Sequence, residues 1–267
     1  MYPTLIDFGP IAIHSFGLMM ALGFLAVLLV SQRDLARKGL DPRPTSSIIL
    51  AAAVGGVVGA KLYSALRDGR IEIAELISNS GLVWYGGLIG ALAAVLFVIH
   101  RSPNPILPTL DTIGMSVLLG HAIGRIGCFL SGDGDYGPPS DLPWAMAFPN
   151  GTVPTDIPVH PTPLYETGML LIGFGLLWSI RKRKEGTPGW LLGGALILEG
   201  AERFIAEFVR LNPPAFFGLT EAQLTSVLMV ISGFFLIYWV TRRSAATEED
   251  TMSTPIPVPK RKKRRRS

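Results

Sequence analysis

Charged residues are scarce in this sequence. Asp, Glu, Lys and Arg make up 16% of the 267 residues, whereas a typical soluble domain has roughly 25%. Hydrophobic residues make up 49%, and the mean hydropathy is +0.41. This composition excludes a disordered chain, a coiled coil and an ordinary cytosolic enzyme.

Cysteine is nearly absent. Because Cys128 is the only one, a disulfide framework and a zinc or iron–sulfur site built from several cysteines are both excluded. Acidic residues are slightly fewer than basic ones, 20 against 24. The chain therefore carries a small basic excess, whose position is informative.

The hydrophobic residues gather in seven apolar segments. A transmembrane helix needs ~20 mostly apolar residues, and these segments have about that length. They are Ile11–Val30, Ser46–Leu66, Leu82–Ile99, Leu110–Ser131, Thr162–Ile180, Gly189–Val209 and Gln223–Val240. No basic residue precedes the first segment, so we interpret it as a span and not as a cleavable signal peptide. The predicted fold is an all-α polytopic membrane protein with seven transmembrane helices.

Basic residues in the connections predict the orientation, because Lys and Arg accumulate on the cytoplasmic side of a membrane. They lie almost entirely in the first, third and fifth connections and after the last segment. The opposite side holds only Arg67, Arg70 and Arg210. We therefore expect the N-terminus outside and the C-terminus in the cytoplasm.

Two segments lie outside the predicted spans. Residues 132–161 are rich in proline and acidic, without an EF-hand spacing, and we interpret them as a solvated extracytoplasmic loop. Residues 244–267 end in a Lys- and Arg-rich run. We interpret them as a disordered cytoplasmic tail that lipid attracts, in preference to a nucleic-acid-binding segment. Residues 1–243 then form one transmembrane domain.

Glycines recur at four-residue spacing within the segments. The pairs are Gly55 and Gly59, Gly86 and Gly90, and Gly120 and Gly124. Small residues let helix backbones approach closely in lipid, so we expect most of these glycines to lie at helix contacts. Gly86 and Gly87 follow Tyr85 and are the exception, because exposed backbone there could approach a ligand.

Charged residues inside the apolar segments are costly, and each is a functional hypothesis by default. They include Lys61, Arg125, Glu199, Glu202, Arg203 and Glu207. Glu199, Arg203 and Glu207 follow one another at four-residue spacing, so they share one helix face. That face could be a self-neutralising ladder that joins helices, or it could bind a ligand.

Depth in the membrane favours a ligand. Arg125 and Arg203 each lie six residues before the outer end of their segment, which is roughly 9 Å below it at ~1.5 Å per residue. Tyr85 lies roughly 5 Å below the same surface. Two arginines at headgroup depth suit a lipid phosphate, whereas a channel or transporter would more naturally place its charges near the midplane.

His121, Arg125 and Cys128 share a face of the fourth segment. His121 could act as a base or could be a packing residue. Cys128 could be a covalent nucleophile or a small apolar filler. The residues alone leave these alternatives open.

Five short motifs follow one another along the chain. In order they are Phe16-Gly-Leu-Met-Met, Tyr85-Gly-Gly-Leu-Ile-Gly, Gly124-Arg-Ile-Gly-Cys-Phe-Leu-Ser-Gly followed by Asp133 and Tyr136-Gly137, His160-Pro-Thr-Pro-Leu-Tyr-Glu, and Arg203-Phe-Ile-Ala-Glu-Phe-Val-Arg. This series resembles the motifs of the bacterial prolipoprotein diacylglyceryl transferases over about residues 9–241. A single Gly-Arg-x-Gly would be a weak signal, but five ordered motifs are a strong one.

The resemblance implies a transferase that moves the diacylglyceryl group of phosphatidylglycerol onto the lipobox cysteine of a prolipoprotein, with release of glycerol phosphate. The implied partners are phosphatidylglycerol, prolipoprotein signal peptides and membrane lipids, with no nucleic acid, and the implied location is the bacterial inner membrane. No cofactor and no metal are expected. Arg125 and Arg203 are then the catalytic cations, because a donor aimed at charge developing on the leaving phosphate is worth ~3–4 kcal/mol.

The sequence departs from the family pattern at several positions. The family commonly has His in place of Tyr85, Tyr in place of Phe16 and Glu199, and Asn in place of Cys128, and residues 132–137 are one residue longer than usual. The missing His is the family's usual candidate for the general base, and tyrosine is a weak base at neutral pH. Tyr85, Glu199 and His121 remain as unranked candidates for the proton acceptor.

The resemblance also implies residues that contact substrate. We expect Glu207 to orient Arg203 or Arg210, and His160 either to bind substrate or to hold the loop against the membrane. The substrate-binding candidates are Arg125, Arg203, Gly86, Gly87, Cys128, Asp133, Gly137, His160, Glu207, Arg210 and Phe16. The alternative function is a catalytically drifted member that binds or transports phospholipid.

Overall fold

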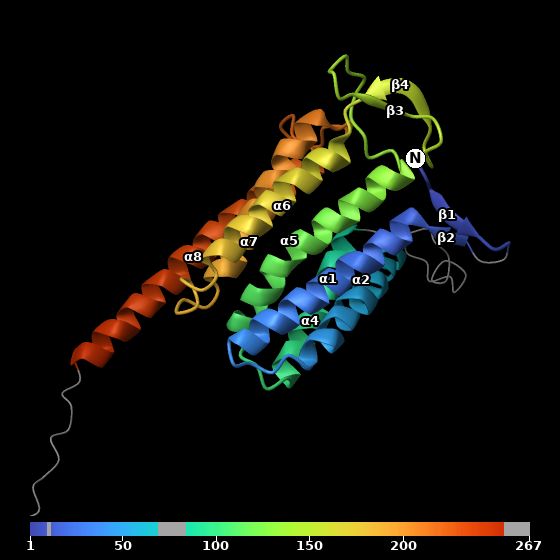
Figure 1. The fold of residues 1–267 in the computed structure, drawn as a ribbon. Helices are drawn as coiled ribbons and strands as arrows, with labels where there is room; N and C mark the ends of the chain where they lie inside the picture. The colour runs from blue at the N-terminus through green and yellow to red at the C-terminus, as the bar shows by residue number, and fades with distance from the viewer. Residues whose placement is uncertain (10–11, 69–83, 254–267) are drawn as a thin grey trace, which may run out of the picture.

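The computed structural model describes residues 1–9, 12–68 and 84–253 as a bundle of helices with two small two-stranded sheets (Figure 1). The helices are α1 (Ser15–Arg37), α2 (Pro44–Asp68), α4 (Trp84–Arg101), α5 (Ile106–Ser131), α6 (Thr162–Ile180), α7 (Trp190–Ala206), the 3-10 helix η1 (Glu207–Val209) and α8 (Glu221–Ser253). The strands are β1 (Thr4–Asp7), β2 (Ala12–His14), β3 (Met146–Phe148) and β4 (Thr155–Val159). Each sheet is antiparallel, β1 with β2 and β3 with β4.

Each of the seven predicted segments coincides with a helix over most of its length. Five helices, α1, α2, α5, α6 and α8, are long and apolar enough to cross a membrane. Over its described residues α4 is apolar but shorter, and α7 has 17 residues that include three charged ones. The all-helical polytopic architecture is confirmed. The predicted starts of the first and third segments, Ile11 and Leu82, lie outside the described residues.

Helix α1 differs from its predicted segment at both ends, because it begins at Ser15, after β2, and continues beyond the predicted end to Arg37. The extension carries Asp34, which is only 1% exposed. Asp34 lies 3.0 Å from the ammonium of Lys38 and accepts a 2.9 Å hydrogen bond from Thr112 of α5. Hydropathy underestimates the length of this helix, because its buried charge is neutralised by the lysine at its own C-terminus and accepts a hydrogen bond from a neighbouring helix.

Helix α8 continues through the predicted start of the tail. The sequence places that start at Ser244, whereas α8 runs to Ser253. The remainder, residues 254–267, lies outside the described residues. The C-terminal part of α8 projects beyond the other helices, at the end of the bundle opposite the strands (Figure 1).

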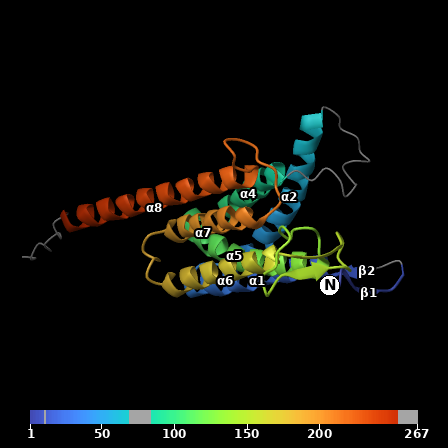
Figure 2. The ribbon, with the colours of Figure 1, turned by 90° about the horizontal axis from the view of Figure 1, so that it is seen from above.

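Helices α5 and α7 occupy the middle of the bundle. Seen from above, they lie between α6 and α1 on one side and α8 and α4 on the other (Figure 2). An apolar core joins α5, α6 and α7 through Met115, Leu118, Leu170 and Leu191. Asp111 of α5 accepts 2.7 Å hydrogen bonds from backbone N–H groups at the start of α7. The polar residues farther along α5 and α7 are therefore held by a fixed scaffold.

Glycines allow the closest helix contacts, above all between α2 and α4. A Cβ atom added to Gly55 would lie 2.7 Å from the carbonyl oxygen of Gly90, so two helix backbones touch there. Gly120 packs in the same way against α1. The predicted packing role is confirmed at these positions, but not at Gly124, where an added Cβ would meet nothing within 4 Å.

Enlarging Gly90 is expected to separate α2 from α4. In Gly90→Leu the new Cβ would lie 2.7 Å from the Gly59 Cα, and overpacking of this kind costs about 1–3 kcal/mol or more. We expect a lower midpoint of thermal unfolding for the detergent-purified variant. Gly175→Ala on α6 is the control, because its Cβ meets nothing within 4 Å and alanine favours a helix. Equal midpoints for Gly90→Leu and the wild type would contradict the packing role.

Candidate active site

A cavity of about 810 Å³ lies among α4, α5, α6, α7 and the start of α8. Its charged lining residues are His121, Arg125, Asp135, Glu166, Glu199, Arg203, Glu207, Arg210 and Glu221. Tyr85 of α4, residues 212–215 and the first turns of α8 complete the walls. Several helices thus present charged side chains to one space, although the chain as a whole has few charges.

The ends of two helices bring the loop to this cavity. Helix α5 ends because Gly132 adopts a left-handed conformation with φ of 58°, which glycine takes at little cost. The chain then turns back, and the Asp135 backbone N–H donates to Asp133 at 3.2 Å. Helix α6 begins with Pro163 in its first turn, a position that suits proline, and places Glu166 one turn further on.

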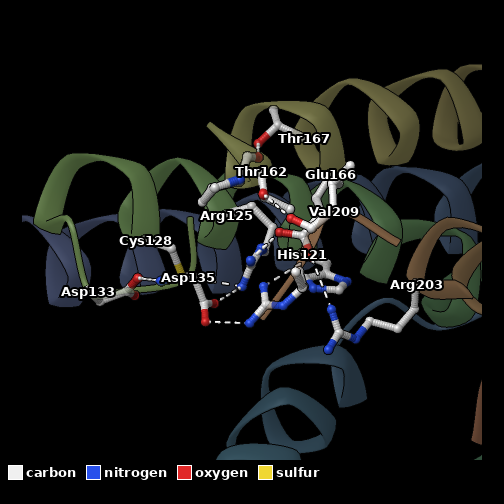
Figure 3. A network of polar contacts seen from close by, with 12 residues as sticks. His121, Arg125, Cys128, Asp133, Asp135, Thr162, Glu166, Thr167, Arg203 and Val209 are labelled. Carbon is white, nitrogen blue, oxygen red and sulfur yellow. Dashed lines mark hydrogen bonds and ion pairs between the residues drawn. The ribbon is translucent and has the colours of Figure 1, made fainter. Parts of the chain in front are cut away.

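Arg125 and Glu166 form the centre of an ion-pair network (Figure 3). Arg125 Nη2 contacts Glu166 Oε2, and Arg125 Nη1 donates to Asp135 Oδ2 at 2.6 Å. Arg203 Nη1 donates to the other Glu166 oxygen at 3.3 Å. The predicted convergence of Arg125 and Arg203 is confirmed, since both contact one carboxylate.

Arg210 supplies a third guanidinium. Its Nη2 donates to Asp135 Oδ1 at 2.5 Å, and its Nη1 lies 3.5 Å from Glu166 Oε1. Burial alone would raise the pKa of the Asp135 carboxyl, but the hydrogen bond from Arg210 and the charges of Arg125 and Arg210 hold that pKa below its usual value. Asp135 therefore stays ionised at neutral pH and accepts two charge-assisted hydrogen bonds.

Glu207 contacts both arginines that it is predicted to orient. Its Oε2 lies 2.7 Å from Arg203 Nη2 and 3.9 Å from Arg210 Nε. Its other oxygen accepts a 2.7 Å hydrogen bond from Asn212 Nδ2. Carboxylates on two sides thus fix the plane of the Arg203 guanidinium.

The three candidates for the proton acceptor all line the cavity. His121 Nδ1 lies 2.9 Å from Glu199 Oε2, so these two form a pair between α5 and α7. The Tyr85 hydroxyl lies 3.4 Å from Thr225 Oγ1 on α8. The His121 side chain is 38% exposed, which leaves part of the imidazole open to a ligand.

Seven predicted substrate-binding residues are not part of the cavity lining. They are Phe16, Gly86, Gly87, Cys128, Asp133, Gly137 and His160. A Cβ added to Gly87 would lie 3.3 Å from a carbonyl oxygen of α2, and Gly86 packs still more closely on that helix. Both glycines therefore serve the α2–α4 contact and do not offer open backbone. Phe16 packs beside Gly127 near the start of α1.

Cys128 and Asp133 contact residues of the network but do not line the cavity. Cys128 is 7% exposed, and its Sγ accepts a 3.5 Å hydrogen bond from Arg125 Nη1. Asp133 accepts the backbone N–H of Asp135. These contacts support Arg125 and Asp135 from outside the cavity.

Gly137 and His160 fasten the loop to the helices. The Gly137 N–H donates to the His160 carbonyl at 2.9 Å, and a Cβ at Gly137 would lie 2.9 Å from His160 Cβ. His160 Nδ1 lies 3.3 Å from the Tyr165 hydroxyl, and Thr162 Oγ1 donates to the Val209 carbonyl at 3.1 Å. These contacts favour the alternative in which His160 holds the loop.

Asp135 and Glu166 are central to the ion-pair network, but neither is among the site residues predicted from the sequence. Glu166 had a usable signal, since it is an acidic residue near the start of an apolar segment. Asp135 had none, because acidic loop residues usually face solvent. Among the described residues, two groups have possible metal-ligand atoms within 4.8 Å of one another, namely His121 with Glu199 and Glu202, and Cys128 with Asp133 and Asp135. The second is already engaged by Arg125 and Arg210.

Comparison with known proteins identifies the family. The model of the protein family described as prolipoprotein diacylglyceryl transferase matches residues 3–239 of this chain. A Clostridium tetani protein named phosphatidylglycerol–prolipoprotein diacylglyceryl transferase is 31% identical over 243 residues, covering 88% of this chain and 96% of the relative. Proteins of the same name from Photobacterium profundum and Pseudomonas paraeruginosa are each 33% identical over 261 residues, covering 92% and 91% of this chain and 95% of each relative. The chain belongs to the prolipoprotein diacylglyceryl transferase family.

Proposed function

We propose that this membrane transferase moves the diacylglyceryl group of phosphatidylglycerol to the thiol of a lipobox cysteine and releases glycerol phosphate. Family membership supports the reaction. The observation that carries it is the meeting of Arg125 and Arg203, from α5 and α7, on Glu166 in the wall of one cavity. Fixed cations in a cavity at one end of an apolar bundle suit an anionic lipid headgroup.

The arginines bind the phosphate and stabilise the leaving group. Of the three guanidinium groups, Arg203 has the most exposed side chain, at 28% against 12% for Arg125 and 13% for Arg210. The substrate sulfur attacks the glycerol carbon, and the electron pair of the breaking C–O bond moves to the phosphate oxygen. Guanidinium groups held in place stabilise that charge without reorganising.

We assign removal of the substrate thiol's proton to the pair His121 and Glu199. A thiol must become a thiolate to attack carbon efficiently. The pair lies in the cavity wall beside Arg125, whereas Tyr85 stands on α4 next to Thr225. We therefore give Tyr85 no part in proton transfer.

Tyr85→Phe is expected to transfer the diacylglyceryl group at about the wild-type rate, because the hydroxyl lies 3.4 Å from Thr225 Oγ1 on α8 and the proton acceptor is assigned to His121 and Glu199. Glu199→Gln, which keeps the size of the side chain, is expected to lose about 10²-fold or more, the usual contribution of a group that assists proton removal. The rate is measured from the mass shift of a lipobox peptide. A large loss in Tyr85→Phe with an active Glu199→Gln would reverse the assignment.

The transfer itself is tested with the purified chain in phosphatidylglycerol nanodiscs. We expect a lipobox peptide to gain the mass of one diacylglyceryl group, with an equal amount of glycerol phosphate released. A peptide with serine in place of the cysteine, and nanodiscs of phosphatidylethanolamine, are the controls. No mass gain under conditions in which the Photobacterium profundum relative is active would refute the proposal.

We also propose that all seven helices cross the bacterial inner membrane, with the N-terminus outside and the segment after residue 243 in the cytoplasm. The N-terminal strands and the 132–161 loop lie at one end of the bundle (Figure 1). The connections after α1 and α6 meet near the other end, where Arg37 lies 2.8 Å from Glu185.

Cysteine labelling tests this orientation. In a Cys128→Ala background, Asp141→Cys is expected to react with a membrane-impermeant maleimide added to spheroplasts, whereas Lys182→Cys is expected to react only after lysis. Both positions are exposed, so access depends on the side of the membrane. The reverse pattern would invert the topology.

A further inference from the structure

Glu202 is a buried carboxylate without a hydrogen-bond partner, and it has no part in the steps assigned to the arginines or to His121 and Glu199. The residue is 4% exposed, and neither of its carboxylate oxygens accepts a hydrogen bond. Burial of an unpaired charge is costly. A buried polar group without a partner therefore calls for an explanation.

The neighbours of Glu202 are the two residues to which removal of the thiol proton is assigned. Glu202 follows Glu199 by three residues on α7, so the two side chains share one face of that helix. A ring nitrogen of His121 and one carboxylate oxygen from each glutamate lie within 4.8 Å of one another. His121 Nδ1 lies 2.9 Å from Glu199 Oε2. The imidazole thus has two carboxylates beside it, of which Glu199 makes the direct contact.

The charges around this imidazole are negative on balance. Five carboxylates stand against three guanidinium groups, namely those of Asp135, Glu166, Glu199, Glu202 and Glu207 against those of Arg125, Arg203 and Arg210. Asp135, Glu166 and Glu207 already contact the arginines. Glu199 and Glu202 are therefore the carboxylates placed to balance a positive charge on His121.

We infer that Glu202 promotes removal of the substrate thiol's proton by stabilising the positively charged form of His121. Glu202 is a positioning residue, because it acts through His121 and is not part of the cavity lining. This role rests on the proposed function, in which His121 and Glu199 accept the proton.

The proton and the electrons of this step balance within the group. The sulfur keeps the electron pair of the S–H bond, and the proton moves to the imidazole. The imidazolium then has Glu199 in hydrogen-bond contact and the charge of Glu202 close by, so the buried carboxylate gains a partner of opposite charge. A buried carboxylate stabilises an imidazolium in the same way in Ser-His-Asp triads.

Glu202→Gln separates this role from packing, because it removes the charge and keeps the size of the side chain. A group that assists proton transfer contributes about 10²–10⁴-fold, and Glu202 supplies part of that effect. We therefore expect transfer to a lipobox peptide to fall by about 10-fold or more. The midpoint of thermal unfolding should stay equal or rise, since an unpaired buried charge has been removed.

A lipobox peptide with selenocysteine in place of cysteine isolates the proton step. A selenol is ionised at neutral pH, so its attack on the glycerol carbon needs no proton acceptor. We expect the wild type and Glu202→Gln to transfer to this peptide at similar rates, and Glu199→Gln to be rescued as well. Ser31→Ala is the matched control, because Ser31 of α1 is also buried with an unpartnered hydroxyl. It should keep wild-type rates with both peptides.

Three outcomes would contradict these expectations. A wild-type rate of Glu202→Gln with the cysteine peptide would overturn the role of Glu202. Equal losses with the cysteine and selenocysteine peptides, together with a lower midpoint, would also overturn it, because they would show a role in packing. No transfer by the wild type to either peptide would instead refute the proposed function on which this role rests.

Discussion

Arg203→Ala is expected to abolish diacylglyceryl transfer while the protein still folds and accumulates in the membrane. Arg203 has the most exposed side chain among the three arginines of the network, so it is the arginine best placed to touch the lipid phosphate. Loss of one donor aimed at developing negative charge lowers a rate by about 10²–10³-fold. Loss of a phosphate-binding group adds to that effect.

The fold should survive because no carboxylate of the network is left without a cation. Glu166 keeps Arg125 and Arg210 within reach, and Glu207 keeps Arg210 and the hydrogen bond from Asn212. Arg203→Ala therefore tests the effect on catalysis without a large loss of stability, whereas a substitution of the central Glu166 would change both.

Transfer to a lipobox peptide and the amount of protein in membranes are the two measurements. Arg183→Ala, which removes an exposed arginine from the connection after α6, should leave both unchanged. Arg125→Ala should also lose transfer, since Arg125 lies in the same cavity. Retained activity in both Arg125→Ala and Arg203→Ala would refute the phosphate role.

The helices and the meeting of the two arginines could be predicted from the sequence. Apolar runs of bilayer length leave few alternatives to helices, because backbone groups in lipid must be satisfied within the segment. Arg125 and Arg203 could be matched by counting residues from the ends of their segments. That count works because a helix rises by a fixed distance per residue.

The partners of these arginines could not be predicted in the same way. Asp135 reaches the site only because Gly132 turns the chain back at the end of α5, and no periodicity encodes that turn. Gly86 and Gly87 were expected to approach a ligand, but which face of α4 meets α2 depends on packing between helices.

Glu166→Gln is expected to be the most destabilising single change in the site. Glu166 is 3% exposed, and its one carboxylate contacts Arg125, Arg203 and Arg210. The neutral amide would leave three guanidinium groups to share two remaining carboxylates. Removal of one partner from a buried ion pair typically costs about 3–5 kcal/mol.

Thermal unfolding in detergent measures this effect. Glu185→Gln is the matched control, because that carboxylate is 40% exposed and pairs with Arg37 outside the site, where an ion pair contributes about 0–1 kcal/mol. Similar midpoints for the two variants would contradict the central role of Glu166.

A second substitution distinguishes an unpaired charge from a simple loss of contacts. Arg210 contacts both Glu166 and Asp135, so Arg210→Met added to Glu166→Gln removes one of the guanidinium groups that the first change left in excess. If excess positive charge is the cause, the double variant should unfold at a higher temperature than Glu166→Gln alone. If lost hydrogen bonds are the cause, the two effects should add and the midpoint should fall further.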